Sequence, residues 1–306
     1  MKSCSTAEEK DLFSRGFVTI ATGNEKYYAL AHNLLESYRL NGKSSVPFAI
    51  ICDRDCKIAR DFDELVLISD PQYSYLDKLS VYQYTPYDET IFIDADILVM
   101  SDIDSIWDDF ASCDDFSCYG SILPLESRDG WFYYKDMGDL QDQIEFGITM
   151  HGGLYYLRKT ERCKEIFTKA IELTRSYDKY KFYYFTKPAD EPVLALSMVL
   201  NGCKPCGLNN PIVVLPGNED KIAVSRDGSL LFDGCVSEAR FIHFGNRNRS
   251  RFVYQYYLKS LKMKRSGNFK PISGLRRFII RLRCLPAELM HKIRRLYRKG
   301  FVAKGV

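Results

Sequence analysis

The sequence lacks three features that would place the protein in a membrane or outside the cell. No apolar run among its 306 residues approaches the length that crosses a bilayer. The segment from Met1 to Arg15 is polar and mixed in charge, without the apolar core of a signal peptide. The ten cysteines follow no disulfide-like spacing, and Cys203 with Cys206 has no second pair that would complete a zinc site. We therefore expect a cytoplasmic protein with reduced thiols.

Internal repeats and low-complexity segments are also missing, and hydrophobic residues make up 46% of the chain, enough for one large core. The net charge of +3 is unevenly distributed. From Arg251 to Val306 there are sixteen Lys or Arg residues and one acid, Glu288. This segment therefore carries +15, which leaves −12 for the first 250 residues. We predict an acidic domain over residues 1–250 and a basic helical tail over residues 251–306.

Strands and helices alternate along the first half of the chain. This pattern predicts an α/β fold, a single domain built on a mainly parallel, Rossmann-like sheet. The segments expected as strands there are 17–21, 47–52, 65–68 and 90–93, and the expected helices are 25–40 and 75–84. After Asp115 the pattern predicts shorter strands and loops. Further helices are expected at 160–177 and 190–200, and further strands at 212–215, 230–232 and 239–244.

Two carboxylates, Asp94 and Asp96, interrupt an apolar stretch and are separated by the small Ala95. Residues 91–93 read as a buried strand, and the apolar run resumes at 97–99. Charges in an apolar context are costly unless they are compensated, and a divalent cation compensates two carboxylates directly. The motif favours a metal-binding site past the end of a strand, where ligands bind in parallel sheets. A charged turn at a sheet edge is the structural alternative.

Five short elements occur in order between Phe17 and Arg249. They are Val18–Thr22 with Tyr27, Leu76–Leu79, Phe92–Val99 continued by Asp102 to Trp107, Met150–Tyr156 followed by Asp190 and Glu191, and Phe241–Gly245. Together they resemble glycosyltransferase family 8, the glycogenin-like and lipopolysaccharide-galactosyltransferase-like enzymes of the GT-A fold. The resemblance implies a UDP-sugar donor, a glycan or lipid-linked acceptor, and transfer with retention.

The resemblance also implies roles for individual residues. Asp94, Asp96 and His243 would be metal ligands, and Asp190 and Glu191 would be the catalytic acids. The implied donor-binding residues are Ala21, Thr22, Tyr27, Lys78, Ala95, His151, Gly152, Gly153, Gly245, Arg247 and Arg249. Three positions depart from the family pattern: His151 replaces an Asn, Glu191 replaces a Gln, and Asn246 to Ser250 replace a Lys-Pro-Trp segment.

The chemistry of sugar transfer gives these residues a physical purpose. A nucleoside diphosphate leaving group is strongly anionic, so positive charge beside it lowers the barrier. Two carboxylates and an imidazole suit Mn²⁺, with Mg²⁺ as the second choice. Lys78 can place an ammonium on the phosphates, and Arg247 or Arg249 can supply a forked donor.

Each of these residues also has a structural interpretation. His243 closes an apolar strand and could be a hydrogen-bonded core residue. Lys78 could lie on a solvated helix face. Asp190 and Glu191 begin a helix, where acids complement the helix dipole. His151 could pack beneath the backbone of Gly152 and Gly153, and these glycines could mark a bulge.

The basic tail has an amphipathic pattern. Apolar residues recur at spacings of three and four from Leu275 to Leu296, and arginines fill the remaining faces. Pro286 is expected to start a second helical segment or to kink one long helix. We expect the tail to bind an anionic membrane surface at the inner face of the membrane. A helix packed on the body is the alternative, and nucleic acid is not an expected partner because base-reading features are missing.

Three function classes follow from the sequence. The leading one is a metal-dependent glycosyltransferase. An aspartate-based phosphatase or phosphotransferase is the second, because a strand followed by Asp-x-Asp also suits that chemistry. The third is a non-catalytic membrane-surface protein with a degenerate transferase fold.

Overall fold

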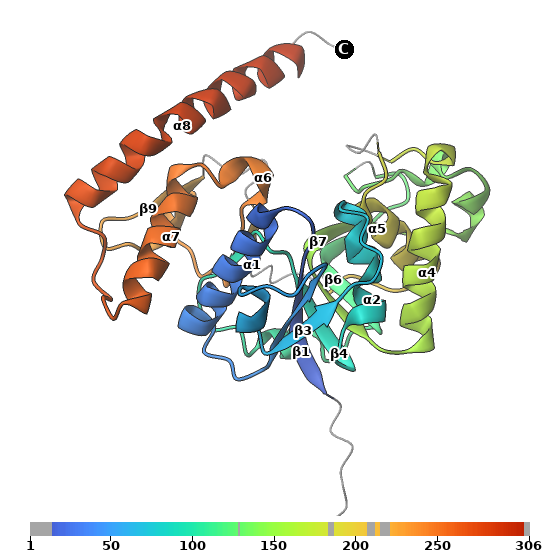
Figure 1. The fold of residues 1–306 in the computed structure, drawn as a ribbon. Coiled ribbons are helices and arrows are strands. Elements are labelled where there is room, and N and C mark those ends of the chain that lie inside the picture. Colours follow the sequence, from blue (N-terminus) through green and yellow to red (C-terminus); the bar gives the residue numbers. More distant parts are fainter. Residues whose placement is uncertain (1–13, 128, 183–186, 207–211, 215–220, 303–306) are drawn as a thin grey trace, which may run out of the picture. The chain divides into compact units, whose positions relative to one another are not determined.

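The structure is a computed structural model that describes residues 14–127, 129–182, 187–206, 212–214 and 221–302 (Figure 1). Residues 212–214, 246–247 and 294–302 are described by their backbone alone. The chain divides into two compact units. Unit 1 comprises Met1–Thr22, Val46–Ile93 and Ser112–Cys206, and unit 2 comprises Gly23–Ser45, Asp94–Ala111 and Gly207–Val306.

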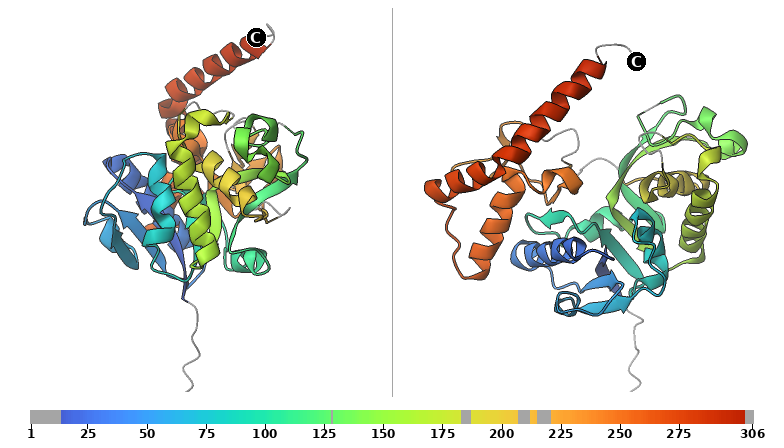
Figure 2. Two further views of the ribbon diagram at one scale, coloured as in Figure 1. Left: turned by 90° about the vertical axis from the view of Figure 1, so that its right-hand side faces the viewer. Right: turned by 45° about the horizontal axis from the view of Figure 1, so that its top comes forward.

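Unit 1 contains a six-stranded sheet with helices packed on it (Figure 2). Its strands are β1 (Arg15–Ala21), β2 (Phe48–Cys52), β3 (Glu64–Leu67), β4 (Glu89–Ile93), β6 (Phe116–Leu123) and β7 (Gly147–Arg158). Its α-helices are α2 (Val81–Tyr84), α4 (Glu161–Arg175) and α5 (Asp190–Leu200). Its 3₁₀ segments are η2 (Ala59–Asp61), η3 (Tyr75–Ser80), η4 (Tyr134–Asp136), η5 (Gly138–Gln143) and η6 (Tyr177–Lys179).

The sheet of unit 1 has the strand order β3-β2-β1-β4-β7-β6. The four strands from β3 to β4 run parallel, whereas β7 is antiparallel to both β4 and β6. β1 and β2 are apolar and almost wholly buried, as strands covered on both faces must be. The α/β fold with a mainly parallel sheet is therefore confirmed. Because β1 and β4 are parallel neighbours, their carboxyl ends, Ala21 and Ile93, lie at the same edge of the sheet.

The prediction of short strands after Asp115 is wrong. β6 has eight residues and β7 has twelve, which makes them the longest strands of the described chain. Glycines at 152 and 153 weaken the strand pattern of β7, but pairing with β4 on one side and β6 on the other stabilises it. The register of β6 with β7 shifts between Cys118, which pairs with Tyr155, and Gly120, which pairs with Met150, so the extra residues of this irregularity lie on β7. A Cβ at Gly120 would collide with the carbonyl of Thr149.

The helix predicted over residues 75–84 forms only in part. The 3₁₀ segment η3 comes first, and α2 adds a single α-helical turn. Local side-chain bonds compete with α-helical hydrogen bonding here, since Ser74 accepts from the Leu76 N–H and Ser80 donates to the Asp77 carbonyl. The short segment brings Asp77 and Lys78 to the protein interior.

Unit 2 contains two small sheets and the C-terminal helices (Figure 1). Its strands form the sheets β5-β12-β8 and β11-β10-β9, with β5 (Ile97–Val99), β8 (Ile212–Val214), β9 (Ile222–Val224), β10 (Leu230–Phe232), β11 (Cys235–Val236) and β12 (Phe241–His243). Its helices are α1 (Glu25–Ser37) with the π-helical turn η1 (Tyr38–Gly42), α3 (Ile106–Phe110), α6 (Gly245–Asn248), α7 (Phe252–Arg265) and α8 (Gly274–Val302).

Side chains from outside its sheet satisfy backbone groups of β5. The Val99 N–H donates to the Ser37 hydroxyl at 2.9 Å, and the Asn41 amide donates to the Val99 carbonyl at 2.8 Å. Lys264 of α7 in turn donates to Asn41 at 2.8 Å. Ser37 is fully buried at the end of α1, and the helix predicted to reach Leu40 continues there as the π-helical turn η1. These contacts fix β5, and with it the turn that carries the two carboxylates.

The basic segment after residue 250 contributes to the core of unit 2. α7 buries Phe252, Tyr254, Tyr256, Tyr257, Leu261 and Met263. α8 continues as one helix through Pro286. Among the described residues, no helix is both long and apolar enough to cross a membrane. The domain boundary at residue 250 stays a prediction.

Candidate functional site

The side chains of Asp94 and Asp96 project from a tight turn in unit 2. Asp94 directly follows Ile93 in the chain, and β5 begins at Ile97. The Ile97 N–H donates to the Asp94 carbonyl at 3.0 Å and closes the turn. Both carboxylates are mostly covered, with exposed fractions of 18% for Asp94 and 17% for Asp96. The turn therefore holds two partly buried negative charges two residues apart.

Strand pairing brings His243 to this turn from more than a hundred residues away. β12 runs antiparallel to β5 in a register that places His243 opposite Ile97. The Phe244 N–H donates to the Asp96 carbonyl at 3.2 Å and ties the two strand ends together. The His243 Nε2 lies 3.0 Å from Asp96 Oδ1 and 3.8 Å from Asp94 Oδ2. His243 is therefore aimed at both carboxylates.

The three side chains fit a divalent cation. One ligand atom from each of Asp94, Asp96 and His243 lies within 4.8 Å of the other two. Two ligands at right angles around an ion with bonds of about 2.1 Å lie about 3 Å apart, which matches the 3.0 Å between His243 and Asp96. Imidazole nitrogen with carboxylate oxygen suits Mn²⁺ or Mg²⁺ better than a structural zinc ion. The three residues predicted as metal ligands are therefore brought together and could hold an ion, and the ion itself stays a prediction.

The residues next to the cluster explain its local shape. Ala95, between the two carboxylates, is buried. Phe244 is fully buried against Tyr254, with the ring centroids 4.8 Å apart. Gly245 has a φ of +60°, a conformation that favours glycine. A close packing partner and a glycine turn thus fix the chain just after His243.

The charges of Arg249 and Asp96 both affect Tyr254, the residue that packs on Phe244. Burial raises the pKa of Tyr254 to about 12, with the Asn33 hydrogen bond and the Arg249 charge opposing this rise and the Asp96 charge adding to it. Arg249 and Asp96 are thus both close enough to influence one phenol. The side chain of Arg247 lies outside the described residues. Tyr27 on α1 is 37% exposed, with the Lys26 ammonium 4.7 Å from its ring.

A buried ion pair joins two predicted residues in unit 1. The Lys78 Nζ lies 3.2 Å from Asp190 Oδ2, and the two side chains are only 13% and 6% exposed. The interpretation of Lys78 as part of a solvated helix face is therefore wrong. Asp190 is the first residue of α5, and its charge is also favoured by the helix dipole. No pattern in the sequence indicates that these two residues pair.

Asp77 is a buried acid that sequence reasoning missed. It is 3% exposed, and its Oδ2 accepts the Thr22 hydroxyl at 2.6 Å while its Oδ1 accepts the Gln72 N–H at 2.6 Å. Thr22 and Ala21 are both buried at the end of β1. The signal was present, since Asp77 directly precedes Lys78 in the second family-like element. The Thr22 hydroxyl proton is already donated to Asp77, so the predicted contact of Thr22 with the donor would have to use another atom of this residue.

Glu191 is held against strand β7. Its Oε1 accepts the Gly152 N–H at 2.7 Å. A Cβ at Gly152 would lie 2.7 Å from the Glu191 Cγ, so this glycine admits the glutamate side chain. Gly153 is buried one position further, and His151 is half-buried on the same strand. Gly152 therefore makes room for Glu191, and both glycines lie in the irregular stretch of β7, residues 151–154, where its register with β6 shifts, in agreement with the bulge interpretation.

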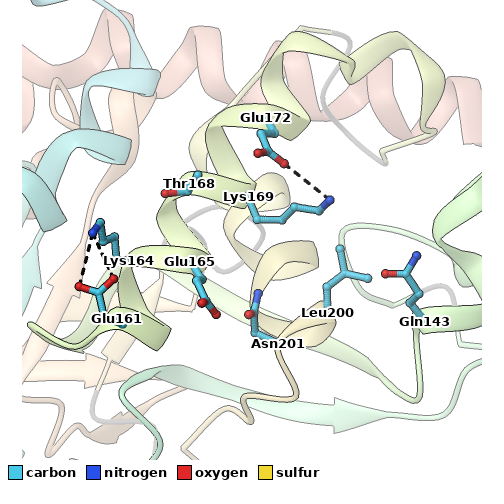
Figure 3. Close-up of a pocket in the computed structure, with 9 residues that line it drawn as sticks. All are labelled: Gln143, Glu161, Lys164, Glu165, Thr168, Lys169, Glu172, Leu200 and Asn201. Carbon is cyan, nitrogen blue, oxygen red and sulfur yellow. Dashed lines mark hydrogen bonds and ion pairs between the residues drawn. The ribbon is translucent and has the colours of Figure 1, made fainter.

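A separate hollow of about 400 Å³ lies along α4 in unit 1 (Figure 3). Figure 3 shows that charged side chains of α4 line it, with Leu200 and Asn201 at the end of α5. The charges pair locally, because Lys164 contacts Glu161 and Lys169 contacts Glu172 at i,i+3 spacing. Exposed pairs of this kind are typical of a solvated helix face. The hollow contains none of the predicted site residues.

Comparison with solved structures identifies the architecture. The galactosyltransferase LgtC, in complex with donor and acceptor sugar analogs, matches with a TM-score of 0.50 and 15% identity over 76% of this chain and 87% of LgtC. The fold is that of the GT-A glycosyltransferases. The apo structure of the bifunctional glycosyltransferase WbbM matches with a TM-score of 0.52 and 12% identity, over 81% of this chain and 50% of WbbM. No family model and no curated protein matches the sequence.

We predict that Mn²⁺ stabilises the protein through the cluster in unit 2. At a hundredfold excess over its dissociation constant, a bound ion adds about 2.7 kcal/mol to the free energy of unfolding. Asp96→Ala and His243→Ala should each remove most of this gain in thermal unfolding experiments. Asp104→Ala, which removes an exposed acid of the same unit, is the matched control and should keep it. An undiminished Mn²⁺ effect in Asp96→Ala would show that the ion binds elsewhere.

We further predict that the pair Lys78–Asp190 is important for stability. Lys78→Ala leaves a buried carboxylate without its ion-pair partner and should lower the free energy of unfolding by roughly 3 kcal/mol. Lys78→Met combined with Asp190→Asn should recover much of this loss, because neither charge then remains buried. Lys164→Ala, which breaks the exposed pair with Glu161, should cost less than about 1 kcal/mol. Urea denaturation measures all three, and equal losses for Lys78→Ala and Lys164→Ala would contradict the assignment.

Proposed function

We propose that the protein is a metal-dependent glycosyltransferase that transfers a hexose-type sugar from a UDP-sugar to a glycan or lipid-linked acceptor. The observation that carries the proposal is the cluster of Asp94, Asp96 and His243 in a chain with the GT-A fold. The LgtC structure with donor and acceptor sugar analogs supports the choice of substrate class. Membership of glycosyltransferase family 8 is part of this proposal and rests on the five sequence elements.

The metal cluster gives the proposal its chemistry. Asp94, Asp96 and His243 would hold Mn²⁺, or Mg²⁺ as the second choice, because their donor atoms are two oxygens and one nitrogen. When bound, the ion would neutralise charge that develops on the departing diphosphate. The His243 Nε2 lies 3.0 Å from Asp96 Oδ1 and 3.8 Å from Asp94 Oδ2. The side chains are thus already gathered before a donor arrives.

Lys78 and Asp190 would act together. An ammonium group has three N–H donors, so Lys78 can contact Asp190 and still donate to a phosphate oxygen. Asp190, fixed by the lysine and by its position at the start of α5, would accept hydroxyl groups of the donor sugar. The contact between Lys78 and Asp190 would thus hold the ammonium beside the phosphate and the carboxylate beside the sugar in one fixed arrangement.

Retention is the proposed stereochemical outcome, by analogy with the family. The departing phosphate would then help to take the acceptor proton, and Asp190 and Glu191 would line the reacting side. The inverting alternative needs a carboxylate base, and Glu191 is the candidate for that role. Its Oε1 is already engaged by the Gly152 N–H, which suits a positioning role better than free movement toward an acceptor.

The remaining donor contacts stay part of the proposal. Backbone at Ala95, Gly152, Gly153 and Gly245 would approach the sugar or phosphates closely, and Arg249 would add positive charge. Contacts from Ala21, Thr22, Tyr27, His151 and Arg247 complete the proposed donor site.

The test is a donor screen with Mn²⁺ that follows nucleoside diphosphate release across UDP-, GDP- and CMP-sugars. UDP-sugars should be preferred, and EDTA should stop release. Asp96→Ala and His243→Ala should lower turnover by about 100-fold or more, because the leaving-group charge is left unmatched. Lys78→Ala should give a smaller loss, and Asp104→Ala should be unaffected.

Other outcomes would redirect the assignment. Preference for GDP- or CMP-sugars, or release that EDTA does not change, would contradict the proposed donor and metal. Hydrolysis of phosphomonoesters without sugar transfer would favour the phosphatase alternative. Mn²⁺ binding without turnover on any donor would favour a degenerate, non-catalytic transferase fold. The anomeric configuration of the product, measured by NMR, distinguishes retention from inversion.

A further inference from the structure

Helix α8 presents its apolar side to solvent. Leu275, Phe278, Leu282, Leu285, Leu289 and Ile293 form an apolar stripe, and they are between 37% and 72% exposed. Cys284 is the one residue of α8 that is buried among its described side chains. A surface helix of a globular protein normally turns its apolar stripe toward the core. The orientation of α8 is the reverse of this pattern.

Polar groups hold α8 to the rest of unit 2. The Arg277 guanidinium donates to the carbonyls of Val224 at 2.8 Å and Ser225 at 2.6 Å, and it lies 5.3 Å from the Tyr256 ring. Glu288 accepts the Phe252 N–H at 3.1 Å, and the Arg251 guanidinium lies 2.9 Å from its Oε2. α8 is thus attached by charged and polar contacts, which leaves the apolar stripe outside.

The angular order of side chains around α8 separates three surfaces. At about 100° per residue, the apolar stripe together with the exposed Ile279 and Met290 beside it covers an arc of roughly 140°. Arg277, Cys284 and Glu288 lie close to the opposite side. The exposed Arg276 and Arg283 border the stripe on one side. Arg281 and Lys292, also exposed, border it on the other. A stripe flanked by cations on both sides matches the acyl and headgroup layers of a lipid surface.

We propose that α8 is a membrane-docking element that lies flat on an anionic bilayer and is fixed to unit 2 by its polar face. The stripe from Leu275 to Ile293 spans roughly 27 Å, and its side chains would enter the boundary between headgroups and acyl chains. The flanking arginines and lysine would contact lipid phosphates. The cytoplasmic leaflet carries the anionic lipids that such a surface requires. This proposal goes beyond the transferase function and does not depend on it.

Charge favours a bilayer over a second copy of the chain as the occupant. Stripe-to-stripe packing of two α8 helices would bring the basic borders of both copies together, and like charges there would repel. Glu288 is the only acid between Gly274 and Val302, and it is already paired with Arg251. A lipid surface supplies the negative charge that a second α8 lacks.

The experiment is vesicle co-sedimentation of the full chain. We expect binding to phosphatidylcholine vesicles that contain about 30% phosphatidylglycerol and little binding to phosphatidylcholine alone. Raising salt from about 0.1 M to about 1 M should weaken binding, because the Debye length falls from about 10 Å to about 3 Å. Arg276→Gln with Arg283→Gln should lower the partition coefficient by about fivefold for each charge removed.

The contribution of the stripe is tested with matched serine variants. Phe278→Ser with Leu282→Ser should lower partitioning by about tenfold or more, since both side chains would enter the bilayer. Leu67→Ser with Ile122→Ser changes two similarly exposed residues of unit 1 and should bind as the unchanged protein does. The Mn²⁺ effect on thermal unfolding should be the same in all these variants, which shows that unit 2 remains folded.

Three outcomes would overturn the proposal. Equal binding to neutral and anionic vesicles would show that the basic residues beside the stripe do not contribute to binding. Equal losses of vesicle binding in the two double serine variants would show that the apolar stripe does not contribute to binding. Concentration-dependent dimers in sedimentation equilibrium that only Phe278→Ser with Leu282→Ser abolishes, without vesicle binding, would identify a second copy of the chain as the occupant.

Discussion

The need to compensate two neighbouring carboxylates organises the candidate site. Asp94 and Asp96 are held at the end of a buried strand, where little water screens their repulsion. A tight turn, the pairing of β5 with β12 and the packing of Phe244 on Tyr254 all serve to place His243 beside them. The imidazole and the two carboxylates could together hold a cation. The same constraint that makes two neighbouring carboxylates costly makes this turn a position that could bind a metal ion.

Charged groups elsewhere in the protein follow the same rule. In unit 1, Lys78 and Asp190 are nearly excluded from water and compensate each other, and the buried Asp77 is satisfied by Thr22 and the Gln72 backbone. In unit 2, the arginine and glutamate of α8 make the contacts that hold the helix, so its apolar residues remain outside. Polar contacts therefore position both the groups proposed for sugar transfer and the surface proposed for lipid.

Much of the architecture could be predicted from the sequence, because local patterns specify it. Alternating apolar strands and amphipathic segments gave the α/β class, and the bounds of α5 and β10 agree with the predicted ones. The Asp94–Asp96 pair was recognisable since two acids within an apolar run are costly. The length of β7 was not predicted, because glycines weaken a strand pattern and the stabilising pairs with β4 and β6 are not visible in the local sequence. The helix predicted over residues 75–84 was too long, because local hydrogen bonds of serine and aspartate residues shorten it.

By itself, the sequence determined the fold class, the two carboxylates and the amphipathic, basic character of the C-terminal helix. Only the tertiary structure decided that Lys78 meets Asp190, that Asp77 holds Thr22, and that Gly152 makes room for Glu191. It also decided which side of α8 contacts the protein. The physical reason is that a periodic pattern depends on neighbours along the chain, whereas pairing of buried charges and glycine contacts depends on residues brought together by strand register and helix packing from distant parts of the chain.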